Sequence, residues 1–565
     1  MTRHFGWTLR LMPRWRILGR ACLAVALWVA GQPVFAQLAT NIAMDVRAMS
    51  LGNAVTADPP GIMAIHFNPA GLAKLEGRRV DLQFVAVDFA LNSLFTAPPG
   101  YNVFGFSDDP VICADPRNDG ADQCREFKVG RSSVEGVSLY APVIDEIIDL
   151  PPGPVAGGPL PSVSIKPPGS KVTFANAIYA PMIAGFHRAD DDPGNFLGKR
   201  VALQRVTYLS PALGWQITDA WSVGGSVGLS YQAIALEMDF RTPNELLGFA
   251  RVLDEDICAP FRGESNIVID IILFGACGAE EGLDPFEPLA AMSLTMEQRL
   301  SPTYNLGVLW QPSKDFSWGA VWQSSARMKL KGKFNVMYEK PVQNVVNSIG
   351  NSPTGSIALA VLGMPSFLPA NEGGLLSMDL PYPAHFQTGI SYRFLPRWKV
   401  NADLGWTDFG KWDAFNVKFD RGVTAMALAR LLSSGVTQSS IAMPLGFSSV
   451  WSAGFGLEWD FTDRLTLRLG IEPRASAIPE DRRSPMVPIN NAMLYGLGLG
   501  YKWDKESQVD LTFSNIQSKD SIPADSSCMA NCTGLENIIY NPYAGLDIQT
   551  EANILYFGLA YRTTW

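Results

Sequence analysis

Apolar and polar side chains alternate along several segments of the chain that are each about ten residues long. The C-terminal segment, residues 555–565, shows the pattern clearly. One of its faces carries large apolar side chains: Leu555, Phe557, Leu559, Tyr561 and Trp565. The other face carries Tyr556, Gly558, Ala560, Arg562 and Thr564. Because successive side chains of a β-strand point to opposite sides of a sheet, this period of two residues predicts strands.

Three further segments, 451–461, 465–472 and 493–503, repeat the alternation, and their second faces are rich in glycine. Tight turns and long connections separate the predicted strands. The turns are 218–220, 312–315, 395–397 and 462–464, and the long connections are 234–300, 335–382, 417–447 and 515–551. Short turns at one end and long loops at the other are typical of outer-membrane barrels, whose apolar faces contact lipid.

A closed barrel is the fold that this pattern predicts. After residue 36 there is no run of about 18 apolar residues free of charge or proline, so membrane-spanning helices are not expected. In hydrocarbon every backbone N–H and C=O must be paired within the protein, so a membrane-spanning sheet must close on itself. A soluble β-sandwich also has alternating strands, but aromatic residues at strand ends and a glycine-rich second face argue against it. We therefore predict an all-β fold, a transmembrane antiparallel β-barrel.

Residues 1–36 have the features of a secretory signal peptide, with a buried N-terminal helix as the alternative. Five arginines and no acidic residue lie in this segment, which contains a short apolar run at 21–30 and ends at Ala36. Without these five arginines, 40 of the 45 Lys and Arg remain against 54 Asp and Glu, so the net charge falls from −9 to −14. Such an acidic chain is not expected to bind nucleic acid.

Six of the seven cysteines follow residue 36, and they lie in three neighbouring pairs. The pairs are Cys113 with Cys124, Cys258 with Cys277, and Cys528 with Cys532. A secreted chain meets an oxidising compartment, so we predict three disulfides that each close a loop. The spacing of Cys528 and Cys532 would also suit a metal, but no histidine or second cysteine pair lies near them in sequence. No metal site is therefore predicted.

Neither a catalytic centre nor a cofactor is predicted. Residues 224–228 match the G-x-S-x-G pattern, yet a period-two strand continues through them, whereas a nucleophile elbow needs a strand, a turn and a helix. The sequence does not place His66, His187 or His385 beside a serine. The acidic runs 190–192 and 254–256 lack the spacing of a calcium loop and are interpreted as solvated charge.

Several short motifs are specific enough to compare with known families. Residues 47–54 read R-A-M-S-L-G-N-A, and Asn68-Pro69-Ala70-Gly71-Leu72 stands just before the first predicted strand. A hairpin at 305–324, a strand at 465–470 and a proline-containing stretch at 478–488 follow in order. From about residue 41 to Trp565, these motifs resemble the FadL family of long-chain fatty-acid transporters.

The resemblance implies a barrel of about 14 strands over residues 79–565, with an N-terminal hatch at 37–78 plugging the lumen. A hydrophobic ligand, a long-chain fatty acid first, is captured between outer loops, moves to a deeper pocket and leaves through a lateral opening. We expect a passive, monomeric channel in the bacterial outer membrane, surrounded by lipid and lipopolysaccharide and inserted by the barrel-insertion machinery. The alternatives are a channel for neutral aromatic or alkane hydrocarbons, a lipid hydrolase, and a barrel without transport.

Within the expected hatch, Pro69 restricts Asn68 to extended geometry, which suits a plug that must turn inside the lumen. An ordinary turn that also includes Ala70 is the alternative.

Four cations share one face of a predicted strand: Arg327, Lys329, Lys331 and Lys333. If that face lines the lumen, Arg327 and Lys329 could hold a ligand carboxylate by charge-assisted hydrogen bonds. If the strand has already left the bilayer, the cations would contact lipopolysaccharide phosphates, which is the favoured interpretation for Lys331 and Lys333.

Two apolar stretches, 357–364 and 423–432, fall in the expected outer loops, and the second has helical spacing. They predict either a capture groove or a cap packed over the barrel. On the strand at 465–472, Arg468 and Glu472 are expected to form a structural pair.

Overall fold

The computed structural model describes residues 40–41, 44–103, 109–113, 129–150, 156–241, 256–261, 267–279, 287–432, 435–474, 476–488, 490–533 and 541–565. The expected signal peptide, residues 1–36, lies outside this part of the chain.

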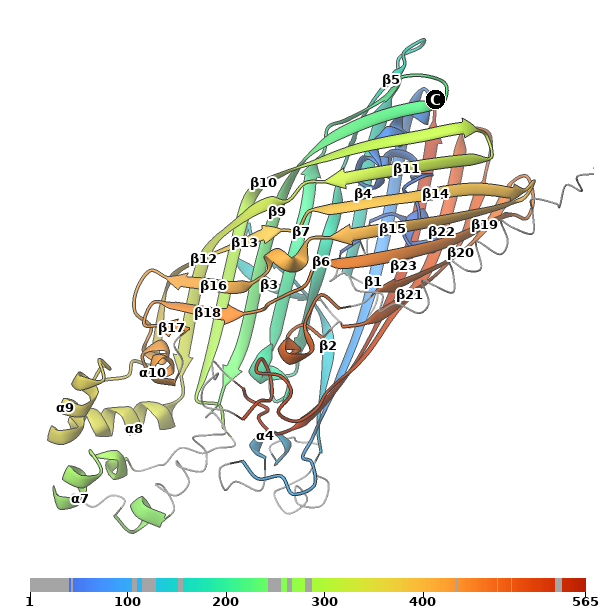
Figure 1. The fold of residues 1–565 in the computed structure, drawn as a ribbon. Coiled ribbons are helices and arrows are strands. Elements are labelled where there is room, and N and C mark those ends of the chain that lie inside the picture. The colour runs from blue at the N-terminus through green and yellow to red at the C-terminus, as the bar shows by residue number, and fades with distance from the viewer. Residues whose placement is uncertain are drawn as a thin grey trace, which may run out of the picture.

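The strands dominate the described residues (Figure 1). They are β1 (Arg78–Thr96), β2 (Val129–Ala141), β3 (Glu146–Leu150), β4 (Ala156–Ile165), β5 (Val172–Ala177), β6 (Tyr179–Arg188), β7 (Arg200–Leu209), β8 (Ala212–Gln216), β9 (Trp221–Phe240), β10 (Ala290–Ser313), β11 (Phe316–Gln323), β12 (Ala326–Tyr338), β13 (Asn371–Tyr382), β14 (His385–Leu395), β15 (Trp398–Thr407), β16 (Ala414–Phe419), β17 (Val436–Thr437), β18 (Ser440–Pro444), β19 (Val450–Asp460), β20 (Leu465–Arg474), β21 (Ala492–Lys502), β22 (Ser507–Ile522) and β23 (Asp547–Thr564).

Short helices occur before β1 and in the long connections between strands. They are α2 (Val46–Ser50), η1 (Gly61–Met63), α3 (Ala64–Phe67), η2 (Pro69–Lys74), α4 (Pro110–Cys113), η4 (Asn195–Leu197), η6 (Ala259–Phe261), α7 (Ile267–Ile272), η7 (Ala276–Gly278), α8 (Lys340–Asn351), α9 (Pro353–Val361), η8 (Phe409–Lys411), α10 (Thr424–Leu432) and η9 (Glu480–Arg482). Within the described ranges, no helix has both the length and the apolar character needed to cross a membrane.

The sheet closes into the predicted antiparallel barrel of 14 strands. Several wall strands consist of two shorter strands in series, such as β11 followed by β12. Closure is made by β1, which pairs along its whole length with β23, from Arg79 opposite Thr564 to Thr96 opposite Asp547. Every backbone hydrogen bond of this seam lies within the protein, as a bilayer requires.

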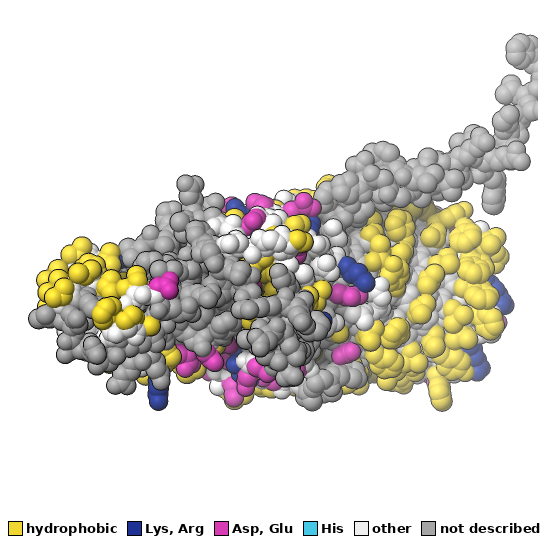
Figure 2. Space-filling model, turned by 90° about the horizontal axis from the view of Figure 1, so that it is seen from below, with side chains coloured by type: hydrophobic (Ala, Val, Ile, Leu, Met, Phe, Trp, Pro, Cys, Tyr) yellow, Lys and Arg dark blue, Asp and Glu magenta, His cyan; other side chains and the backbone are white. Residues whose placement is uncertain are grey.

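A band of exposed apolar side chains surrounds the wall near the short turns. Leu306, Leu404, Leu469 and Leu497 each expose about half of their side-chain surface there. In Figure 2 this band covers the right-hand part of the molecule, and charged side chains lie beyond it toward the long loops. The band is the lipid-facing surface, so the short turns are periplasmic and the long loops extracellular.

Above this band the apolar face of the wall points into the lumen, and the polar face points outward. On β10, Leu306 points outward and is exposed, but beyond the irregularity at 298–301 the apolar Met296 and Leu294 are buried in the lumen. On β12, Met328 is likewise buried inside. Outside the bilayer an outward face must be polar, so the strands continue into water with their apolar side inward.

This exchange corrects two of the expected loop boundaries. The connections predicted at 234–300 and 335–382 are in large part strand, because β9 continues to Phe240, β10 begins at Ala290 and β13 begins at Asn371. In these stretches the outward side chains are polar, so the apolar outward face that marks a membrane-spanning strand in the sequence is missing.

Residues 44–77, which we name the plug segment, lie inside the lower barrel. Their helices α2, η1, α3 and η2 are almost wholly buried. Wall glycines permit a very close approach: a Cβ on Gly224 would lie 2.3 Å from the carbonyl carbon of Pro69, and one on Gly319 would lie 2.4 Å from the carbonyl oxygen of Thr56. The glycine-rich second face of the strands is therefore the surface that receives the plug segment.

The wall is interrupted between β1 and β6. Strand β2 pairs with β1 only at residues 92–96, then leaves the wall as a hairpin with β3, and β4 returns to pair with β1 at 78–87. Residues 88–91 of β1 have no strand partner on this side among the described residues. The β2–β3 hairpin packs on the outer face of the barrel, where Tyr140 covers Ala233 and Ala235 of β9.

Candidate functional site

A continuous apolar cluster fills the upper lumen. It is formed by the inward faces of β10, β12, β13 and β16 and by helix α10. Its buried members include Met182, Leu294, Met296, Met328, Leu330, Phe334, Met378, Leu380, Trp412, Val417 and Met426. Methionine is unbranched and polarisable, so a cluster rich in it can repack around apolar molecules of different shape.

One buried cation, Arg205 of β7, lies at the plug side of this cluster. Its guanidinium donates to Gln232 Oε1 at 2.6 Å and to Ser301 Oγ at 3.1 Å, and it lies 4.3 Å from the centre of the Tyr382 ring. The residue is only 2% exposed, and among the described side chains no carboxylate forms an ion pair with it. A buried charge whose neighbours are all neutral is costly, so this position favours an incoming anion.

The lumen beside Arg205 is nearly closed. A cavity of about 10 Å³ separates Arg205 and Tyr382 from His66 and Tyr179. That volume holds about one water molecule. A larger molecule can therefore reach the guanidinium only if the apolar cluster or the plug segment moves.

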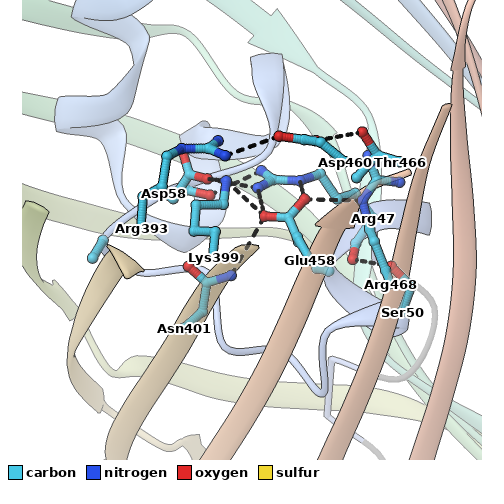
Figure 3. A network of polar contacts seen from close by, with 12 residues as sticks. Arg47, Ser50, Asp58, Arg393, Lys399, Asn401, Glu458, Asp460, Thr466 and Arg468 are labelled. Carbon is cyan, nitrogen blue, oxygen red and sulfur yellow. Dashed lines mark hydrogen bonds and ion pairs between the residues drawn. The ribbon is translucent and has the colours of Figure 1, made fainter. Parts of the chain in front are cut away.

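A network of ion pairs joins the plug segment to the periplasmic half of the wall (Figure 3). Arg47 bridges Asp58 at 2.6 Å and Glu458 at 2.8 Å, and Lys399 contacts the same two carboxylates at 2.5 and 2.6 Å. Arg468 continues the network from Glu458 along the wall. Beyond these residues it extends through the pairs Arg468–Asp510, Asp510–Arg562 and Arg562–Asp45.

Four cations and four carboxylates in this network neutralise one another. Burial alone would raise the pKa of Asp58, but Lys399 and Arg47 lower the pKa below its usual value. The carboxylate is therefore ionised throughout the physiological range. Because removing one partner of a buried pair leaves an uncompensated charge, the network holds the plug segment firmly in this position.

The interruption in the wall has an apolar rim and is occupied by the start of the described chain. Phe89 and Leu160 pack with Ile183 around it. Thr40 forms a β-bridge with Met182, and the Asn41 N–H donates to the Pro181 carbonyl at 3.1 Å. Residues 40 and 41 therefore lie against β6 at the interruption, on the lumenal side, where the Thr40 carbonyl also accepts from Arg474 at 2.6 Å.

The sequence model of the outer membrane protein transport family (OMPP1/FadL/TodX) matches residues 157–565, which is well over half of the chain. The chain belongs to this family. It is an outer-membrane protein, and the predicted localisation is confirmed.

Curated relatives and solved structures agree with this assignment. The long-chain fatty acid transport protein of Escherichia coli strain K12 is 20% identical over 312 residues, 53% of this chain and 62% of the relative. The protein of that name from E. coli O6:H1 is 21% identical over 216 residues, 38% of this chain and 42% of the relative. These alignments span about half of the curated relatives' length.

The fold of the family extends over nearly the whole chain. A Pseudomonas aeruginosa FadL homologue aligns with a TM-score of 0.62 at 15% identity, over 94% of this chain and 100% of the other. The Pseudomonas putida toluene transporter TodX aligns with a TM-score of 0.56 at 13% identity, over 94% of this chain and 99% of that protein. At these identities the likeness shows a shared fold.

Asn68 of the FadL-family motif holds the plug segment to the wall. It is extended at the start of η2, with Pro69 as the first residue of that helix. Its amide Nδ2 donates to the Thr56 carbonyl at 2.9 Å and to the Val308 carbonyl at 3.0 Å, and its Oδ1 accepts from the Ala70 N–H at 3.2 Å. The residue therefore joins the plug segment to β10 besides shaping the turn.

Arg327 and Lys329 do not line the lumen. Their side chains are exposed, whereas Met328 and Leu330 on the opposite face of β12 are buried in the lumenal cluster. The reason is the exchange of faces above the lipid band. The geometry gives no support to the ligand contact predicted for these two residues, and the buried cation that the sequence did not single out is Arg205.

The expected pair of Arg468 and Glu472 is not formed, although both residues are buried on the lumenal side. Arg468 pairs with Glu458 and Asp510, while Glu472 accepts from Asn53 Nδ2 at 2.8 Å. Both instead connect to charged or polar groups on neighbouring strands and on the plug segment.

The structure joins Cys258 to Cys277 and Cys528 to Cys532. Cys113 is also disulfide-bonded, and its predicted partner Cys124 lies outside the described residues. Among the described residues no group of three or more His, Cys, Asp or Glu could hold a metal ion.

His187 does lie near a serine and an aspartate, on the outer face of the wall. The Ser138 hydroxyl donates to Asp149 Oδ1 at 2.5 Å, and His187 Nδ1 is 3.4 Å from Ser138 and 3.6 Å from Asp149. In a catalytic triad the serine and the aspartate contact opposite ring nitrogens of the histidine. Here both face Nδ1, so the cluster does not form a nucleophilic relay.

The two apolar loop stretches have different surroundings. In α10, Met426 is buried in the lumenal cluster and caps it, while Ala427 packs against Leu359 and Met364 of the other stretch. In the other loops Ile357 and Val361 of α9 and Ile272 of α7 are more than half exposed. Figure 2 shows this second apolar surface at the end of the molecule opposite the lipid-facing band.

Proposed function

We propose that this chain admits hydrophobic monocarboxylates, long-chain fatty acids first, through the outer membrane. The observation that carries the proposal is Arg205, a buried cation that forms no ion pair with any carboxylate the structure describes, placed where the apolar lumenal cluster ends. A fatty acid matches both parts, because its hydrocarbon tail replaces the apolar contacts and its carboxylate supplies the missing anion.

The path begins at the loops. The exposed apolar side chains of α7 and α9 would collect the ligand from water, since such surfaces gain free energy when an apolar molecule covers them. Two of the three disulfides that we predict lie in the described loops and would restrict their motion. The ligand then displaces the α10 cap and enters the methionine-rich cluster.

Exit follows through the wall. The interruption between β1 and β6 has an apolar rim at Phe89, Leu160 and Ile183 and is occupied by Thr40 and Asn41. Movement of the plug segment would withdraw these two residues and open a sideways route from the lumen into the bilayer. Uptake in this scheme is passive and needs no other energy source.

Binding of matched ligands to an Arg205→Gln variant tests the proposal. Loss of a charge-assisted pair should weaken binding of a labelled fatty acid about tenfold to a hundredfold. The neutral alcohol of the same chain length should bind the variant and the parent protein equally. Lys329→Gln, which neutralises an exposed cation on the outer face, is the matched control and should bind both ligands as the parent does.

A neutral hydrocarbon is the second candidate ligand, because the lumenal cluster is apolar and the toluene transporter TodX shares the fold. If a neutral hydrocarbon is the ligand, Arg205→Gln should leave uptake of toluene unchanged. The parent protein should then bind the fatty acid no better than the alcohol of the same chain length. That pair of results would overturn the fatty-acid proposal.

A further inference from the structure

A groove of about 640 Å³ lies on the outer face of the barrel, away from the lumen. One wall is the tip of the β2–β3 hairpin, and the other consists of outward side chains of β10, β12, β13 and β16. Arg299, Lys331, Lys333 and Lys418 contribute cations to it. Three carboxylates, of Asp145, Glu297 and Asp420, also line it. Arg327 and Lys329 extend the row of cations along β12, and we name this row, with the groove, the basic surface.

The basic surface lies just above the lipid-facing band. Strand β11 ends beside Trp322, an exposed aromatic of that band, and β12 carries the chain onward toward the extracellular loops. Aromatic side chains mark the boundary between hydrocarbon and headgroups in membrane barrels. The cations of β12 therefore sit at the level of the headgroups of the outer leaflet.

Three of these cations form no close ion pair with a described carboxylate, although Lys329 lies opposite Asp379 of β13 and Lys331 lies opposite Glu297 of β10. Among the described residues, Arg327, Lys329 and Lys331 form no ion pair, whereas Lys333 is bound by Asp145 of the hairpin and Arg299 by Glu297 at 2.7 Å. The cations stand at every second position of one strand face, so neighbouring members of the row repel one another weakly through water. Binding of a phosphorylated group across the row would remove that repulsion.

Apolar side chains border the groove where they are not needed for packing. Val143 at the hairpin tip is 94% exposed, and Ile144 beside it is 56% exposed. Leu300 of β10, next to Arg299, is 55% exposed. A free anion would gain nothing from this apolar edge, whereas an amphiphile with a phosphorylated head would cover it with its acyl chains.

We propose that this surface binds lipid A, the phosphorylated glycolipid anchor of lipopolysaccharide in the outer leaflet. Its phosphates contact Arg327, Lys329 and Lys331, and its acyl chains cover Leu300 and the hairpin tip. Asp145 of the hairpin binds Lys333, so a phosphate competes with the hairpin for that cation. The inference concerns the outer face and does not depend on what passes through the lumen.

Binding of lipid A to the folded protein in detergent micelles tests this, with the triple variant Arg327→Gln, Lys329→Gln, Lys331→Gln. These exposed side chains make no packing contacts that the fold needs, and resistance of the barrel to denaturation in dodecyl sulfate checks folding. The control neutralises Lys314, Arg464 and Lys505, three exposed cations on the periplasmic turns. The triple variant should bind bis-phosphorylated lipid A about tenfold or more weakly than the control.

Two further ligands separate the possible sources of binding. Dephosphorylated lipid A should bind the parent protein no better than the triple variant binds the intact lipid. Millimolar inorganic phosphate should not displace lipid A, and full displacement would show that the acyl chains contribute nothing and would overturn the proposal. Equal binding of lipid A by the triple variant and its control would overturn it as well. Fatty-acid binding, measured in parallel, should be the same in both variants.

Discussion

Burial in the lumen changes the chemistry of two side chains that look ordinary in the sequence. Arg205 carries its charge among neutral partners, and its neighbour across the small cavity, His66, is uncharged. Burial, with a smaller contribution from His385, lowers the pKa of His66 to about 3. Its Nε2 lies 2.9 Å from Asn41 Oδ1, so it also contacts the segment that occupies the wall interruption. Protonation of His66 would therefore weaken the packing of the plug segment inside the barrel.

Acidification should loosen the plug segment through this residue. The folded pKa of His66 lies below the value of about 6.5 for a free histidine, so the stabilisation is complete above pH 6.5 and decreases as the pH falls toward 3. Between pH 7 and 5 the released state gains about 2 kcal/mol relative to the seated one. Hydrogen exchange of the plug amides, corrected for the intrinsic rate, measures this. A His66→Gln variant should lose that pH dependence, and its persistence would assign the effect to other groups.

Residue identities alone could not place the cations of β12. Alternation correctly put Arg327 and Lys329 on one face of a strand and Met328 and Leu330 on the other. It could not tell which face was the lumen, because apolar side chains point outward within the bilayer and inward above it. Arg205 was missed for a related reason, since only the folded barrel shows that its described neighbours are Gln232, Ser301 and Tyr382, with no carboxylate in an ion pair among the residues placed.

At the level of elements, the strands and tight turns near the periplasm followed directly from the period of two residues. The β2–β3 hairpin did not, since its residues also alternate and nothing local shows that they leave the wall. The glycines of the second face were predicted as small lumenal positions. These positions must be glycine because an added Cβ would lie less than 3 Å from the plug segment. The sequence does not show this contact, since the plug residues lie far earlier in the chain.

A valine at Gly224 should prevent the plug segment from seating while leaving the barrel folded. Its Cβ would overlap the Pro69 carbonyl carbon at 2.3 Å, and the other nearest atoms, Pro69 O and Ala70 N, are also backbone, which adjusts less easily than a side chain. The neighbouring Gly225→Val is the matched control, because its Cβ would point outward and meet Leu306 at 3.5 Å. Ion conductance across a planar bilayer should rise for Gly224→Val alone. Equal conductance in the two variants would show that the plug does not close the lumen.

The molecule consists of a closed barrel wall and the plug segment inside it, and different interactions hold these two parts in place. The wall is closed by the β1–β23 seam, which involves no residue of the plug segment. Within the ion-pair network each wall cation also has a partner in the wall: Lys399 and Arg468 contact Glu458, and Arg468 and Arg562 contact Asp510. The plug contributes Asp45, Arg47 and Asp58. Without the plug segment the wall keeps these ion pairs, which then face a lumen that water can fill.

Deleting residues 37–75 should therefore leave a folded barrel with altered uptake. We expect the truncated protein to insert into the outer membrane and to conduct small ions, because its wall contacts remain. Fatty-acid uptake should lose saturation, since the ligand no longer has to displace the plug segment to reach the wall interruption. Uptake by cells that express the truncated or the full protein, measured over a range of concentrations, provides the comparison. Normal rate and normal saturation in the truncated protein would show that the plug segment has no part in gating, and the interruption in the wall would then be open at all times.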